Sequence, residues 1–234
     1  MRAGAALARA ALLALAGLAA CTPAGRPPPP AEQIAPAAAA GGGVRYRIDP
    51  LRSELRILVY RAGPLARLGH NHVLLARDLA GEVWLPADPA AARFAVSFPV
   101  AALAVDEPAA RREEGEEFAS EPSAEDVAGT RRNLEGPALL DAARYPVIRL
   151  DGVAAQGPGG LIARARVVVR EHAAELEVPV EVARTPAELV VRGGFTVEQH
   201  ALGLEPFSVA LGALRVRDDL AVRLRLVAAP DPAP

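Results

Sequence analysis

The sequence predicts an all-β fold, an antiparallel barrel of about eight strands whose path is interrupted by a helical insertion. Apolar and polar residues alternate in one segment after another, as at Phe94, Val96 and Phe98, which share one face. Strands with one apolar face form antiparallel sheets that are buried on one side and wet on the other. A sheet of this size closes on itself, and its interior then fills with side chains or holds one small ligand.

The strands are predicted from this alternation and from the turns that bound it. Charged rows at 164–170 (arginine) and 175–181 (glutamate) point outward from neighbouring segments, so the two rows are able to pair across the sheet. A glycine pair at 193–194 predicts a bulge or bend. The predicted strands are, in chain order, 46–50, 54–60, 73–76, 82–85, 93–100, 147–150, 161–170, 174–182, 188–197 and 219–227.

The inward side chains of these strands are the candidate lining of a cavity. Only 4% of the residues are aromatic, and Ala, Val and Leu dominate the inward rows, so few bulky rings are present to fill a barrel. This composition favours a ligand cavity, with a packed core as the alternative for each residue. The predicted lining residues are Leu58, Val96, Phe98, Leu176, Val178, Val222 and Leu224.

A pair of histidines marks the segment that leads into the strand at 73–76. In an extended chain, side chains two residues apart point to the same face, so His70 and His72 share a face and Asn71 opposes them. One interpretation is a polar cluster near the barrel mouth, together with His200, and the other is a polar loop that enters a strand. A third is a metal or haem site, in which His200 or His172 supplies the additional ligand that such a pair needs.

An acidic stretch from Asp106 to Asp126 interrupts the strand pattern. It holds nine carboxylates and two arginines, a local charge of −7, and it has no continuous apolar stripe. It is therefore predicted to be a solvated insertion, and its spacing fits no calcium loop. A helix is expected over 130–143, with Thr130 or Asn133 as its cap.

The first 21 residues have the features of an export signal. Arg2 and Arg9 give a positive region before an apolar run at 10–20, which is too short for a good transmembrane helix. The run ends in Leu18-Ala-Ala-Cys21, which resembles a bacterial lipobox, and lipidation explains a single cysteine in an exported chain. The alternative is an ordinary signal peptide in which this cysteine is incidental.

The rest of the chain divides by composition. Residues 22–43 are rich in Pro, Ala and Gly and are predicted to be a tether, 44–230 to be the barrel domain, and 231–234 to be a tail. Thr22 follows the cysteine, so the resemblance to Gram-negative lipoproteins implies an outer-membrane anchor facing the periplasm. The net charge of −2 gives no support for a nucleic-acid partner.

Five short motifs stand in a fixed order within residues 44–228. They are Tyr46-x-Ile-Asp-x-x-x-Ser53, Asp78-x-x-Gly81, the helix and Tyr-Pro pair of 139–148, the segment 195–203, and Val216-x-Asp-Asp219. In this order they resemble the YceI-like family of bacterial lipid- or polyisoprenoid-binding proteins. The resemblance implies an extended, lipocalin-like antiparallel barrel with an apolar tunnel, which binds a polyisoprenoid or quinone-like lipid and needs no cofactor.

The chain departs from the family pattern at several positions. Gln199-His200 stands where the family has an arginine, a turn glycine is missing at 170–172, and the acidic stretch is longer than usual. The histidine pair at residues 70 and 72 is not a general family feature. These departures bear on the identity of the ligand more than on the fold.

Besides a lipid carrier and a metal or haem protein, two other classes of function stay open. Residues 44–230 contain no Gly-x-Ser-x-Gly elbow, phosphate-binding loop or cysteine nucleophile, although a histidine beside one of the carboxylates is able to act as a base. A structural envelope protein without a ligand would also want a closed barrel on a tether. We expect a non-enzymatic envelope protein that binds an apolar lipid.

Overall fold

The structure, a computed structural model, describes residues 43–231. These residues comprise the predicted barrel domain with one further residue at each end. The predicted signal peptide, the lipidation site Cys21, most of the tether and most of the tail lie outside the described residues.

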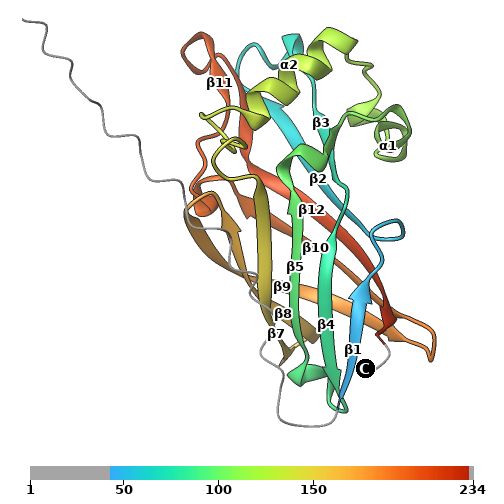
Figure 1. Ribbon diagram of the computed structural model, residues 1–234. Helices are drawn as coiled ribbons and strands as arrows, with labels where there is room; N and C mark the ends of the chain where they lie inside the picture. The colour runs from blue at the N-terminus through green and yellow to red at the C-terminus, as the bar shows by residue number, and fades with distance from the viewer. Residues whose placement is uncertain (1–42, 232–234) are drawn as a thin grey trace, which may run out of the picture. The chain divides into compact units, whose positions relative to one another are not determined.

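Eight antiparallel strands close into a barrel (Figure 1). Each strand pairs with the next in the order β1-β4-β5-β7-β8-β9-β10-β12, and β1 then pairs with β12 through Tyr46 and Pro230. The predicted antiparallel barrel is therefore confirmed. The strands are β1 (Gly43–Ile48), β4 (Ala80–Pro86), β5 (Arg93–Pro99), β7 (Val147–Gly157), β8 (Gly160–Val169), β9 (His172–Arg184), β10 (Leu189–Glu198) and β12 (Leu214–Pro230).

Three further strands continue the sheet at the end of the barrel drawn uppermost in Figure 1. They are β2 (Glu54–Ala62), β3 (His72–Ala76) and β6 (Leu103–Val105), and they pair in the order β12-β2-β3-β6. One edge of β12 pairs with β2 over most of its length and with β1 at its end. A further strand, β11 (Ser208–Val209), pairs with the start of β12. The sheet thus has a lower part built on β1 and β4 and an upper part built on β2 and β3.

Alternation along the strands separates an apolar interior from a charged outer face. Arg164 of β8 lies opposite Glu177 of β9 in the register of the two strands, and its Nε is 3.0 Å from a carboxylate oxygen of Glu177. The predicted pairing of the arginine and glutamate rows is confirmed at this position. Both side chains are more than half exposed, so the pair contributes at most about 1 kcal/mol to stability.

One predicted bulge and one predicted strand end were wrong. The bulge expected at Gly193 and Gly194 is absent, because both residues pair in step with β12, and the irregularity lies instead in β12 itself, between Val216 and Leu220. The strand β7 does not end at Gly152. It continues to Gly157, because a Cβ at residue 152 would lie 2.0 Å from the carbonyl oxygen of Arg164, so glycine is what permits the close approach of β8.

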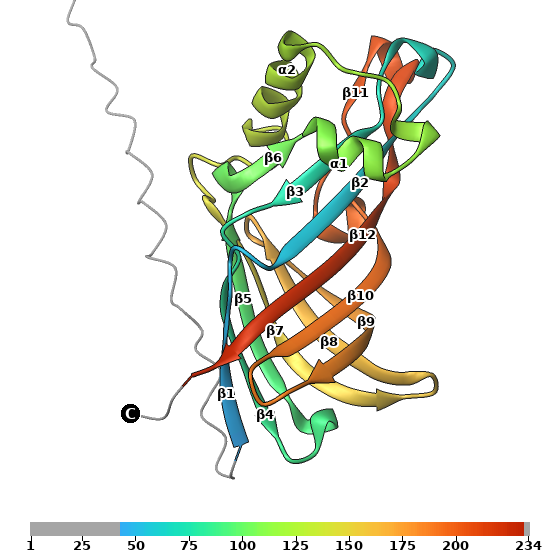
Figure 2. The ribbon, with the colours of Figure 1, turned by 90° about the vertical axis from the view of Figure 1, so that its right-hand side faces the viewer.

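The acidic stretch is folded, and it is not only the solvated insertion that the sequence predicted. It forms α1 (Pro108–Glu113), η4 (Glu116–Phe118) and the start of α2 (Ala124–Glu135), and α1 lies against β3 (Figure 2). Phe118 is 2% exposed, and the Glu114 side chain accepts hydrogen bonds from Arg56 of β2 and Arg223 of β12. These buried and paired side chains hold the insertion against the outside of the barrel.

The predicted helix at 130–143 is displaced. The helix α2 begins after Ser123, whose side chain and backbone form a capping box with Asp126, and it ends at Glu135 before Gly136. Thr130 and Asn133, the predicted caps, therefore lie inside the helix. Within residues 43–231, no helix combines the length and the apolar character that crossing a bilayer requires.

Candidate ligand-binding cavity

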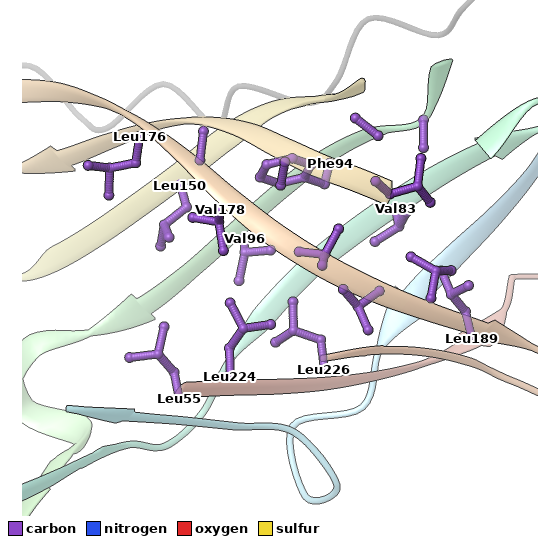
Figure 3. Close-up of a pocket in the computed structure, with 18 of the residues that line it drawn as sticks. Leu55, Val83, Phe94, Val96, Leu150, Leu176, Val178, Leu189, Leu224 and Leu226 are labelled. Carbon is purple, nitrogen blue, oxygen red and sulfur yellow. The ribbon is translucent and has the colours of Figure 1, made fainter. Parts of the chain in front are cut away.

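The lower part of the barrel encloses a cavity whose lining is entirely apolar. Its volume is about 110 Å³, and every lining side chain is aliphatic or phenyl. Leu55 from β2 and Leu224 and Leu226 from β12 point into the same space as the side chains of the opposite wall (Figure 3). The labelled lining residues on that wall and beside it are Val83, Phe94, Val96, Leu150, Leu176, Val178 and Leu189.

Four of the seven predicted lining residues lie on this cavity, namely Val96, Leu176, Val178 and Leu224. Phe98 and Val222 are buried in the main core but do not line it. Sequence alternation selected the correct face of these strands. Which of the inward side chains border the cavity depends on the shape of the barrel, and the alternation of apolar and polar residues carries no information about that shape.

Leu58 corrects the prediction of an inward row on β2. It belongs to a second apolar cluster, which also contains Val73, Phe118, Leu75 and Ala110, under α1 and η4. The inward residues of β2 are Leu55, Ile57 and Val59. Both faces of β2 therefore carry buried apolar side chains, because one face lines the barrel interior and Leu58 on the other face packs against the insertion.

A second cavity of about 180 Å³ lies in the upper part of the barrel, under α2. Most of its lining is apolar, including Ile57, Leu74 and Leu220. Its polar lining consists of four side chains, which are His72, Thr130, Asn133 and Gln199. The upper cavity therefore differs from the lower one in offering hydrogen-bonding groups to a ligand.

His72 is fixed in place by a buried ion-pair network. Its Nδ1 lies 2.7 Å from a carboxylate oxygen of Asp106, and the other oxygen accepts hydrogen bonds from Arg111 and from the Val73 backbone. Arg111 also donates to the carbonyl oxygens of Asn71 and Ser120. Burial alone would raise the pKa of Asp106, but the hydrogen bonds and charge of His72 and the donors on Val73 and Arg111 outweigh it, so the pKa lies below its ordinary value.

The three histidines of the predicted polar cluster occupy different surroundings. His72 faces the upper cavity. The Nε2 atom of His70 lies 3.9 Å from a carboxylate oxygen of Asp126 in α2. His200 is exposed and lies between Asp218 and Glu205. His70 precedes β3. The Asn71 side chain accepts a hydrogen bond from the backbone N–H of Arg61 in β2 and donates one to the carbonyl oxygen of Glu117 in the insertion. Within residues 43–231, no group of three histidine, cysteine or acidic side chains is arranged to hold a metal ion, so the geometry gives the metal alternative no support.

Asp106, Arg111 and Phe118 are structurally important, and the sequence reasoning missed them. Charge counting treats an acidic stretch as solvated, whereas here one arginine and one carboxylate of that stretch pair with each other inside the protein. The available signal was Phe118, a single aromatic residue among nine carboxylates. An aromatic residue in such a setting has a large apolar surface to bury.

Comparison with known proteins relates this barrel to solved structures only. No protein-family model matches the chain, and no curated protein matches it. Burkholderia cenocepacia BcnA superposes with a TM-score of 0.56 at 15% identity, over 78% of this chain and 99% of that one. A polyisoprenoid-binding domain from Saccharophagus degradans superposes with a TM-score of 0.53 at 10% identity, over 80% and 99%.

The fold and the cavity define a class of protein, the extended antiparallel barrels with an apolar interior. The solved structures identify which barrel of this class the chain resembles. A mutant of the Campylobacter jejuni YceI protein also superposes, with a TM-score of 0.50 at 8% identity over 68% of this chain and 84% of that one. The fold of the chain is YceI-like. The resemblance drawn from its sequence motifs is thereby confirmed at the level of the fold.

Proposed function

We propose that the protein binds the apolar chain of a lipid, such as a polyisoprenoid or a quinone-like lipid, inside the barrel and does no chemistry on it. The observation that carries this proposal is the lower cavity, which has an entirely apolar lining. A ligand there gains about 25 cal/mol for each Å² of apolar surface removed from water. The description of the Saccharophagus degradans barrel as a polyisoprenoid-binding domain supports the same class of ligand.

The size of the cavities restricts the shape of the ligand. The lower cavity, of about 110 Å³, and the upper one, of about 180 Å³, are each smaller than the roughly 300–1,000 Å³ of sites for drug-sized molecules. A slender, flexible chain suits such narrow spaces better than a fused ring system does. A long chain would extend from the lower to the upper cavity, with its polar end near His72 and Gln199.

The location of the protein is part of the proposal and rests on the sequence. The apolar run and Leu18-Ala-Ala-Cys21 support export and lipidation, followed by anchoring in the outer membrane on the periplasmic side. The tether at 22–43 would then hold the barrel at the membrane surface. An exported barrel on such an anchor would meet lipids in the cell envelope.

The direct test is native mass spectrometry of the full chain, together with organic extraction of what co-purifies with it. We expect a lipid bound one to one, or, after delipidation, one-to-one uptake of farnesol as a short isoprenoid probe. A delipidated protein that takes up neither farnesol nor palmitic acid would refute the proposal.

A matched pair of variants locates the binding. Ala163→Leu adds three carbons to the lining of the lower cavity, and we expect at least tenfold weaker farnesol binding because the space is filled. Val153→Leu enlarges an exposed outward side chain of β7 and serves as the control with unchanged binding. Equal affinity in both variants would move the ligand out of the lower cavity.

A further inference from the structure

Two loops lie side by side at the upper end of the barrel. One, residues 61–69, leads from β2 towards β3, and the other, residues 206–217, contains β11 and the start of β12 (Figure 1). The backbone N–H of Leu65 donates to the carbonyl oxygen of Ala213, over a distance of 2.8 Å between nitrogen and oxygen. The two loops therefore form one continuous edge, here called the apolar rim after the residues Leu68, Phe207, Val209 and Leu211.

The rim exposes large apolar side chains. Leu211 is fully exposed, at 108% of its reference surface, and Leu68 is 62% exposed. Ala210 and Leu211 both adopt left-handed backbone angles, with φ of 50° and 55°, which are unfavourable for residues other than glycine. Leu211 is thus exposed to water at the tip of a strained turn. Burial of this side chain against a surface outside the chain would explain the arrangement.

The charge within these two loops has one sign, whereas Asp126 of the acidic insertion lies 3.9 Å from His70, the residue that follows the first loop. Residues 61–69 and 206–217 contain four arginines and no acidic residue. Of these, Arg217 pairs with Asp219, whereas Arg67 and Arg215 take part in none of the ion pairs within residues 43–231. The flanking carboxylates, Glu205 and Asp218, are engaged by His200. Exposed apolar side chains with unpaired arginines beside them match a surface that presents phosphate groups above hydrocarbon.

The rim also borders the upper cavity. Phe207 is part of the rim, and it lines that cavity together with Val216 of β12. Any surface against which the rim rests would therefore lie next to the polar-lined end of the barrel interior.

We propose that the apolar rim docks the barrel onto the surface of an anionic lipid bilayer, with Leu211 inserted among the lipids and Arg67 and Arg215 at the headgroup phosphates. This surface contact is distinct from the lipid anchor expected at Cys21. It also differs from ligand binding in the barrel, because Leu211 lines neither cavity.

The first test places a dye on the rim. In the full chain with Cys21→Ser, which removes the only cysteine, Leu211→Cys is labelled with an environment-sensitive dye. With phosphatidylcholine vesicles containing about one third phosphatidylglycerol, we expect a blue shift and a rise in emission at residue 211. Leu51→Cys provides the control, because Leu51 is 94% exposed but lies in the β1–β2 turn. Equal responses at the two positions, or a concentration-dependent response at residue 211 without vesicles, would overturn the proposal, and the latter would indicate contact between two copies of the chain.

The second test separates the two contributions to docking. Leu211→Asn suits the left-handed backbone, so the fold is retained, and it should lower partitioning into these vesicles about tenfold or more. Arg67→Gln and Arg215→Gln should each lower it about fivefold, and only when phosphatidylglycerol is present. Leu51→Asn should leave partitioning unchanged, and Leu211→Asn, Arg67→Gln and Arg215→Gln should leave farnesol binding unchanged, because none of these residues lines a cavity. Undiminished partitioning of Leu211→Asn would overturn the proposal. A parent chain that partitions into the vesicles but binds no farnesol would instead count against the carrier function.

Discussion

The lower and upper parts of the sheet share the long strand β12 but are stabilised differently. The lower part has an apolar interior and charged pairs such as Arg164 with Glu177 on its outside. The upper part keeps a charged pair away from water, because Arg111 and Asp106 of the insertion are buried against β3. The lining of the lower cavity makes no directional contacts, whereas the wall of the upper cavity includes His72, which hydrogen bonds of fixed geometry hold in place.

This difference suggests a division of labour. An apolar lining adapts to chains of differing length and branching, since dispersion and burial have no preferred direction. The buried network instead holds His72 at the wall of the upper cavity and attaches the insertion to β3. Ligand affinity would then arise mainly in the lower cavity, and the upper cavity would set the shape and polarity of the entrance.

The largest expected effect is the loss of Arg111. Arg111→Met leaves the Asp106 carboxylate and the carbonyl oxygens of Asn71 and Ser120 without their buried donor, and we expect a loss of about 3–5 kcal/mol in the free energy of unfolding. Urea denaturation measures this. The control is Arg77→Met, which removes an exposed pair with Glu107 and should cost at most about 1 kcal/mol. Equal losses of unfolding free energy in the two variants would contradict the expected difference between the buried ion pair and the exposed one.

The next effect concerns the cavities. Thr130→Leu adds bulk to the α2 wall of the upper cavity and leaves the lower one unchanged. We expect several-fold weaker binding of a long polyprenol, because about 0.8 kcal/mol is lost for each CH₂ group that no longer fits. Farnesol, held in the lower cavity, should bind as before. Titration with both probes checks this, and equal weakening of the two would mean that the cavities do not act separately.

The buried network also predicts an acid dependence. Because the folded-state pKa of Asp106 is lowered, its stabilisation is present above the ordinary value of 3.8 and is lost as the pH falls through the folded-state value. Asp106→Asn should therefore flatten the decline of unfolding free energy below about pH 4. Stability curves at a series of acid pH values measure this slope. An unchanged slope would assign the acid sensitivity to other carboxylates.

The smallest effect is expected at the exposed histidine. Hydrogen bonds from His200 to Asp218 and Glu205 raise the pKa of His200, so its contribution to stability is present below its ordinary value of 6.5 and disappears as the pH rises through the raised value. NMR titration should give a lower pKa for His200 in the Glu205→Gln variant than in the parent chain. A pKa that stays the same would show that Asp218 acts alone.

The sequence was sufficient for the barrel because alternation is a local property that strands retain in any context. It indicated β5, β8, β9 and β12 and the faces that hold Val96, Leu176 and Leu224. It failed where a distant segment decides the outcome. Leu58 lies outside the barrel because residues 108–118 cover that face, and Arg111 is buried because β3 lies beneath it. The periodicity within β2 or within the acidic stretch does not predict that these two segments pack against each other.

The closure between β1 and β12 also constrains how the chain folds. Tyr46 pairs with Pro230, so the barrel joins residues at the two ends of the described chain. Contacts between such distant residues make folding slow, on the order of milliseconds to seconds in small β proteins. The amino-terminal strands must wait for β12 before their edges are covered, so the chain emerges from synthesis without a closed barrel. Deleting residues 228–230 would leave β1 without its closing partner and open the barrel.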